Sequence, residues 1–222
     1  MCFAPYTSIS TFVIEFSLAI YFLLRNPKDK LNIIIALLSF LLGIYQLNEF
    51  LICTTQIKLF TILAMSVTAI LPAISINFAL IMWRKKLRYY WNILIYAPAI
   101  FFIIYFPFLY KISAECKTIF IEYPWIGIMG NFYALYYGIY ILAAAIIFYF
   151  GASATKSKYQ KRLLHLGVLS MLIFTVPTFV FLIFLPQFSV QFASVLCEFG
   201  LLLAITFIII IRYKEKHKLK FN

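Results

Sequence analysis

The chain has 222 residues, 65% of them hydrophobic and only 12% charged, and its formal net charge is +12. Together with a mean hydropathy of +0.99, this composition excludes an ordinary soluble domain, and the small numbers of glycine (7) and proline (8) exclude collagen-like and disordered chains. The sequence contains no Gly-rich phosphate loop, paired-histidine motif, Cys-x-x-Cys or nucleophile elbow, so motifs alone assign no enzyme class.

A helix needs about 20 mainly apolar residues to cross about 30 Å of hydrocarbon, and the chain divides into seven such runs. We therefore predict an all-α polytopic membrane protein, a single domain over residues 1–222. Its predicted transmembrane helices are residues 7–24, 31–53, 59–83, 91–110, 127–152, 163–185 and 192–211. We interpret the first run as a retained helix, because it has no small-residue cleavage site that would mark a signal peptide.

The distribution of lysine and arginine predicts the orientation, because short basic loops are retained in the cytoplasm. Sixteen of these residues fall on one side of the seven predicted helices and three on the other. We expect the amino terminus outside, the carboxyl terminus in the cytoplasm, and the protein in the cell membrane. The basic ends would face anionic lipid headgroups, so the net charge requires no nucleic acid. The loops are too short for a folded effector domain, so any signalling would need a protein partner.

Three carboxylates, Glu15, Glu49 and Glu198, lie inside the predicted spans. An intramembrane carboxylate costs about 2.5–3.5 kcal/mol at the bilayer centre and is by default a hypothesis of a functional site. At 1.5 Å per residue, the three lie about 12, 6 and 9 Å below the outer ends of their helices, and therefore in one leaflet. No basic residue lies at that depth, so each carboxyl must be protonated, hydrogen-bonded or shared with a cation.

Polar residues of the first three helices are the candidate hydrogen-bond partners: Ser17, Gln46, Asn48 and Asn77. The predicted site for a proton, a cation or a small ligand comprises Glu15, Gln46, Glu49, Asn77 and Glu198. Within it, we expect Glu49 and Glu198 to approach each other, with at least one of them holding a proton or cation. The alternative is that neutral glutamates only pin helices together through hydrogen bonds.

All four cysteines fall on the predicted outer side: Cys2, Cys53, Cys116 and Cys197. In an oxidising exterior Cys53 and Cys116 could pair, and in a reducing one the four could bind a soft metal together with carboxylate oxygen. Their spacing matches no zinc motif. The favoured interpretation is that they are free, buried thiols that behave as small hydrophobic side chains.

Other features indicate architecture. One face of the helix predicted over 127–152 carries Tyr133, Tyr136, Tyr137 and Tyr140. Aromatic stripes at this spacing are more often packing and interfacial anchors than the lining of a polar cavity. Four prolines inside predicted spans should bend their helices and free backbone carbonyls: Pro72, Pro98, Pro107 and Pro177.

A resemblance rests on four short segments: Met1-Cys2-Phe3 followed by Thr7-Ser8, Gln46-Leu47-Asn48-Glu49, Pro72 followed by Arg84-Lys85-Lys86, and Ser194-Val195-Leu196-Cys197. With these the chain resembles an uncharacterised family of small seven-helix prokaryotic membrane proteins. That family begins Met-Cys-Phe-Ser-Ala and carries Gln-x-x-Glu-Gly at the end of helix 2 and Trp-Cys in helix 7. The resemblance implies that Cys2, Gln46, Glu49 and Cys197 belong to one outer-side constellation, and it implies no activity.

Among function classes we expect a non-enzymatic integral membrane protein with this carboxylate site, and we assign no cofactor. The alternatives are an intramembrane thiol or metal-dependent redox protein, and a structural subunit of a membrane complex. A rhodopsin-like photoreceptor is excluded because the last helix has no interior lysine for a retinal Schiff base. We find no similarity between the first three and last three helices, which a sugar transporter built of two repeats would show.

Overall fold

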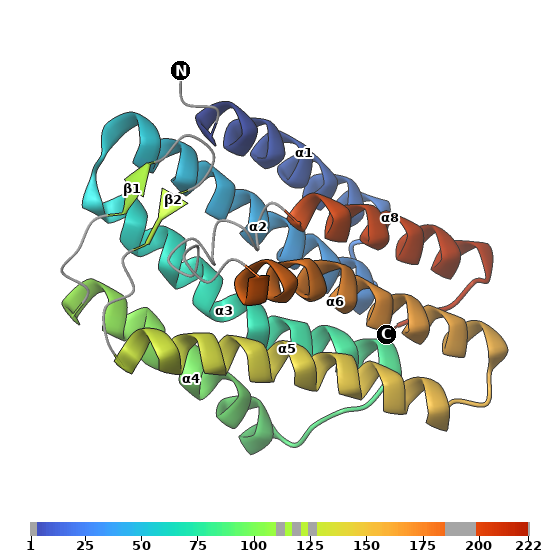
Figure 1. Cartoon of the computed structure of the whole chain (residues 1–222). Helices are drawn as coiled ribbons and strands as arrows, with labels where there is room; N and C mark the ends of the chain where they lie inside the picture. Colours follow the sequence, from blue (N-terminus) through green and yellow to red (C-terminus); the bar gives the residue numbers. More distant parts are fainter. Residues whose placement is uncertain (1–3, 110–113, 117–120, 124–127, 185–198, 222) are drawn as a thin grey trace.

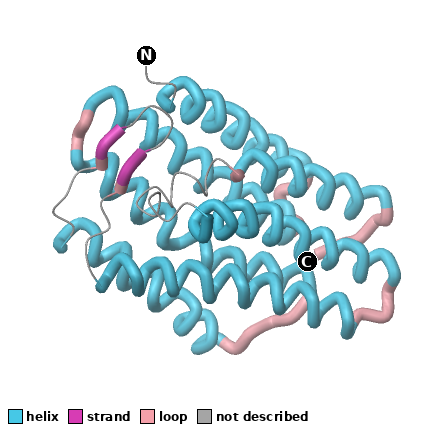
Figure 2. Tube along the Cα trace, in the orientation of Figure 1, coloured by secondary structure: helices cyan, strands magenta, loops and turns pink. Residues whose placement is uncertain are grey.

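The computed structural model is mostly helical and describes residues 4–109, 114–116, 121–123, 128–184 and 199–221 (Figure 2). The helices in these ranges are α1 (Ala4–Arg25), α2 (Lys30–Thr55), α3 (Lys58–Trp83), α4 (Tyr89–Leu109), α5 (Ile128–Ala154), α6 (Lys158–Phe184) and α8 (Gly200–Lys216). Two short strands, β1 (Glu115–Cys116) and β2 (Ile121–Glu122), pair in antiparallel register. The all-helical class predicted from the sequence is therefore confirmed, apart from this small hairpin.

Helix α3 is the centre of the bundle, since it contacts α2, α4, α5 and α6 (Figure 1). Helix α1 packs along α2, and α8 packs against α6, α1 and α2. The ring of Phe78 in α3 meets Phe148 of α5 and Phe207 of α8 edge-on, with ring centroids 5.2 and 5.6 Å apart. Edge-to-face packing of this kind fixes the helices around one apolar core.

Large apolar side chains also lie on the outer surface of the bundle, where their contact with water would be unfavourable. Tyr89 and Phe108 of α4 are 79% and 78% exposed, and Leu142 of α5 is 61% exposed. Helices α1 to α5 are each long and apolar enough to cross a membrane. An apolar exterior on helices of this length is typical of a protein whose solvent is lipid.

The predicted helix bounds agree with the structure to within about five residues at the described ends. The largest differences lie at the basic ends, where α6 begins at Lys158 and α8 continues to Lys216. These ends extend past the apolar runs because long basic side chains let a helix project beyond the hydrocarbon. The predicted start of the last helix, at residue 192, lies outside the described residues.

A disulfide fastens the hairpin to the bundle. Cys53 near the end of α2 bonds Cys116 of β1, 63 residues away. The Ala114 amide also donates to Thr61 Oγ1 of α3, at 3.4 Å. The interpretation of these two cysteines as free thiols is therefore wrong. The sequence does not predict β1 and β2, because strands of two residues are too short to show an alternation of apolar and polar side chains.

At the opposite end a single buried carboxylate joins three parts of the chain. Asp29 caps α2 by accepting hydrogen bonds from the amides of Leu31 and Asn32, at 3.0 and 3.2 Å. It forms an ion pair with Lys214 of α8, at 3.0 Å, and both side chains are about 95% buried. It also accepts a hydrogen bond from the amide of Phe221, at 3.2 Å.

The carboxyl-terminal tail folds back onto this end. The chain turns at Lys218, whose φ is 51°, and the Phe221 carbonyl then accepts a hydrogen bond from the Lys30 amide at 2.9 Å. Arg84 at the end of α3 donates to the Lys220 carbonyl at 3.0 Å, and the Phe221 side chain is buried. The tail therefore bridges the first turn of α2 and the last turn of α3.

Two glycines allow close helix contacts elsewhere in the core. A Cβ at Gly167 of α6 would lie 2.6 Å from the Phe148 ring, and one at Gly151 of α5 would lie 2.8 Å from the Trp83 ring. At Gly43 of α2 the nearest atoms would be 3.5 Å away, an ordinary contact. The α5–α6 crossing thus depends on the absence of a side chain at Gly167.

We expect Asp29→Ala to lower the free energy of unfolding by about 3–5 kcal/mol, because it leaves Lys214 buried without its counter-ion. Glu215→Ala is the matched control, because Glu215 lies next to Lys214 on α8. It removes an ion pair with Arg25 that is partly exposed, and such pairs contribute at most about 1 kcal/mol. Chemical unfolding in detergent micelles measures both, and equal losses would contradict the role given to Asp29.

Gly167→Ala should destabilise the bundle by about 1–3 kcal/mol, because the rigid Phe148 ring must move to admit a methyl group. Gly43→Ala should be neutral or stabilising by up to about 1 kcal/mol, since alanine is the better helix former and meets no clash there. Thermal melting of the two variants in one detergent tests this contrast. Similar melting temperatures would show that the α5–α6 contact is looser than described.

Candidate carboxylate site

Glu15 is a fully buried carboxyl group in the described part of the chain. It lies on α1, is 0% exposed, and neither of its carboxyl oxygens has a hydrogen-bond partner. Its Cβ would be 3.5 Å from a methyl group on Gly43, an ordinary contact that places Glu15 beside Gly43 of α2. Its Oε1 would be 2.8 Å from a methyl group on Gly200, which places the carboxyl against the first residue of α8.

Glu49 lies on α2 and is buried as well, with 3% of its surface exposed. Tyr45, one turn earlier, donates to Glu49 Oε1 at 2.7 Å, and Ser8 of α1 lies 3.5 Å from Oε2. Spacing of four residues places Tyr45 and Glu49 on one helix face. Glu49 is also close enough to Glu15 for the charges of the two groups to interact.

The hairpin reaches this site through a second tyrosine. The hydroxyl of the buried Tyr123, which directly follows β2, lies 3.2 Å from that of Tyr45. A tyrosine hydroxyl has one proton to donate. The Tyr45 hydroxyl lies between Glu49 and Tyr123, so it can donate to one of them while it accepts from the other. A chain of hydrogen bonds therefore runs from the hairpin to the Glu49 carboxyl.

The remaining polar residues predicted near the carboxylates take different positions. Gln46 is buried on α2, three residues before Glu49. The Asn48 side-chain amide donates back to the Ile44 carbonyl at 2.7 Å, so it bonds to its own helix. Ser17 is exposed on α1. Gln46 is the one of these three whose burial and spacing keep it with Glu49.

Asn77 was wrongly grouped with the carboxylates. It lies 19 residues along α3 from Lys58, which is about 28 Å from the first residue of that helix. Its amide donates to the Tyr96 hydroxyl of α4. Its polar group thus stabilises the α3–α4 contact in the other half of the bundle.

Three residues of the predicted constellations lie outside the described residues: Cys2, Cys197 and Glu198. The expected approach of Glu49 and Glu198 therefore stays a prediction. Cys53 and Cys116 are bonded to each other, so neither offers a thiolate to a metal. Within the described ranges no group of three or more His, Cys, Asp or Glu side chains is placed to hold a metal ion.

Sequence reasoning missed Ser8, Tyr45, Tyr123 and Gly200 as parts of the site. Tyr45 had a usable signal, because it lies four residues before Glu49 and faces the same way. Tyr123 had none, since its contact depends on a hairpin that the disulfide holds in place. Gly200 had none either, because close approach of a carboxyl to a glycine leaves no pattern in a sequence.

The tyrosines of α5 form packing contacts and bonds to α3. The Tyr133 hydroxyl donates to Thr68 Oγ1, and that of Tyr136 to the Ala69 carbonyl, both at 2.8 Å. These bonds lie beside Pro72, which lacks the amide that would otherwise bond the Thr68 carbonyl. The tyrosine stripe therefore stabilises the helix near its proline.

A small cavity lies close to Glu15 in the described part of the bundle interior. A cavity of about 10 Å³ is lined by residues of α2, α3, α5, α6 and α8, among them Leu42 and Leu203. Leu42 would also be 3.9 Å from a methyl group on Gly200, next to Glu15. A space of this size holds about one water molecule.

No protein-family model, no curated protein and no solved structure matches this chain. A functional assignment therefore depends on the chemistry of the site.

Proposed function

We propose that this chain is a multi-pass membrane protein that holds a proton or a small cation between Glu15 and Glu49. The observation that carries the proposal is the Glu15 carboxyl, which is fully buried and has no hydrogen-bond partner in the described part of the chain. An ionised carboxylate without partners is very costly to bury. A proton on Glu15, or a cation beside it, removes that cost.

The surroundings of Glu49 support a proton-holding role. The hydroxyls of Tyr123 and Tyr45 connect Glu49 to the hairpin. Such a chain passes protons because each hydroxyl both accepts and donates. When the charges of two carboxyls interact, a state is favoured in which at least one of them is neutralised by a proton or a cation. Protons would therefore exchange with the surroundings through the hairpin end.

We further propose that the hairpin end faces the outside and the tail end the cytoplasm. Disulfides form in oxidising compartments, and the Cys53–Cys116 bond lies at the hairpin end. Most lysines and arginines lie at the opposite end, as short cytoplasmic segments require. These two lines of reasoning are independent, and both place the carboxylate site in the outer half of the membrane.

Labelling of single cysteines tests the orientation. Cys2 and Cys197 are first replaced by serine, while the Cys53–Cys116 disulfide is kept because it holds the hairpin. A thiol reagent that cannot cross the membrane should then modify Phe3→Cys in intact cells and should modify Lys218→Cys only after the cells are opened. The reverse pattern would place the carboxylates in the inner leaflet.

Infrared spectroscopy of protein in nanodiscs tests the site. We expect a band from a protonated carboxyl group that disappears in Glu15→Gln and persists in Glu215→Gln, an exposed control at the other end. If the occupant is a cation, added cation should instead raise the melting temperature of the wild type and not of Glu15→Gln. A Glu15→Gln variant that changes neither the band nor the response to cations would refute the site.

A further inference from the structure

A second polar feature lies at the tail end, far from the carboxylates. A cavity of about 190 Å³ opens between the end of α3, the start of α2 and the carboxyl-terminal tail. Its lining is Lys30, Ile81, Arg84, Lys85, Lys86, Lys220 and Phe221. Five of these seven residues are basic and none is acidic. A water molecule takes up about 30 Å³ of liquid, so the cavity accommodates a group of several heavy atoms.

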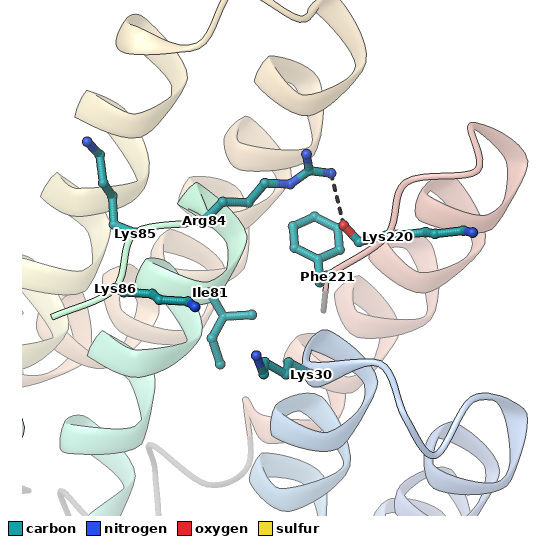
Figure 3. Close-up of a pocket in the computed structure, with 7 residues that line it drawn as sticks. All are labelled: Lys30, Ile81, Arg84, Lys85, Lys86, Lys220 and Phe221. Atoms are coloured by element: carbon teal, nitrogen blue, oxygen red, sulfur yellow. Dashed lines mark hydrogen bonds between the residues drawn. The ribbon is translucent and has the colours of Figure 1, made fainter.

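The basic side chains do not all point the same way. Figure 3 shows the ammonium groups of Lys30 and Lys86 on either side of the Ile81 side chain, near the space between α2 and α3. Lys85 points away and lies over the Trp83 ring, 5.3 Å from its centroid. Lys30 begins α2 and Lys86 lies in the loop between α3 and α4, so the tertiary fold is what brings their charges together.

No carboxylate in the described part of the chain neutralises the basic side chains of this cavity. Asp29 adjoins Lys30 in sequence, but its oxygens are taken by Lys214, the Phe221 amide and the first amides of α2. Neither Lys30 nor Lys86 forms an ion pair with a described residue. Two converging ammonium groups repel each other, and an anion between them would turn repulsion into attraction.

Arg84 occupies a strained and well-fixed position at the rim. Its φ is 60°, in the left-handed region that glycine adopts most easily. The αL turn is held by the Lys85 amide, which bonds the Leu80 carbonyl at 3.0 Å. The guanidinium is anchored by the Lys220 carbonyl at 3.0 Å and lies 4.9 Å from the centroid of the Phe221 ring. These contacts still leave guanidinium N–H groups to bind an anion.

From this geometry we propose that the cavity binds a phosphate ester, with Lys30, Arg84 and Lys86 as its ligands. Charge-assisted bonds from lysine and arginine to phosphate oxygens are among the strongest hydrogen bonds in proteins. The cavity opens at the end of the bundle where membrane headgroups and dissolved metabolites both have access. The phosphate could therefore belong to an anionic lipid or to a soluble ester, and the experiment separates the two sources.

The lipid arm uses purified full-length protein in nanodiscs of phosphatidylcholine, with or without phosphatidic acid, and counts retained lipids by native mass spectrometry. We expect retention of phosphatidic acid over phosphatidylcholine. Arg84→Gly should weaken this retention about tenfold, the loss of one charge-assisted bond. Glycine suits a φ of 60°, so the turn after α3 should form as it does in the wild type, while the contacts of Arg84 with the tail are lost. Lys86→Gln should have a similar effect without touching the backbone.

The soluble arm adds inorganic phosphate or glycerol phosphate to protein in phosphatidylcholine nanodiscs and measures binding by calorimetry. Binding that Arg84→Gly weakens would assign the cavity to a soluble ester. Lys158→Gln, at the exposed start of α6 and outside the cavity, is the charge-matched control. Equal losses in Lys158→Gln and Lys86→Gln would mean diffuse attraction to a basic surface and would overturn the proposal. So would the absence of any preference for phosphate in both arms.

Discussion

Every polar atom buried in this apolar bundle must find a partner, and the two ends of the molecule meet that constraint in opposite ways. Asp29 is fully satisfied by two helix amides, one tail amide and the Lys214 ammonium. Glu15 is equally buried, yet the described part of the chain offers its oxygens nothing. The first arrangement stabilises, since each bond to a buried charge contributes about 1.5–3 kcal/mol. The second is tolerable only if something outside the chain completes it.

Each end is closed by a long-range link between segments that are distant in sequence. At one end the Cys53–Cys116 bond fixes the hairpin so that Tyr123 reaches Tyr45. At the other, Asp29 fixes the tail so that Phe221 closes one wall of the basic cavity. Each link therefore adds a residue to one of the proposed sites. The links thus do more than stabilise, because they place the groups that would contact a proton or a phosphate.

Much of the fold could be predicted because apolar runs, separated by clusters of charge, mark helices in lipid. The same reasoning found Glu15 and Glu49, because a carboxylate is conspicuous in an apolar run. It failed for Asn77, because a helical run alone does not say which neighbour a side chain meets, and Tyr96 lies on another helix. It also assigned the basic loops to lipid headgroups in general. Only the tertiary fold shows that Lys30 and Lys86 converge while Lys85 turns to Trp83.

Both proposed sites include residues of α2, but the distance between the sites keeps them independent of each other. Lys30 begins that helix and Glu49 lies 19 residues further along, a separation of about 28 Å at 1.5 Å per residue. That exceeds the spacing of about 7–10 Å beyond which substitutions usually act independently. Charge at one site therefore has little direct effect on the other. Any influence of a bound phosphate on the carboxylates must pass through movement of α2 itself, which α1 and α3 hold along its length.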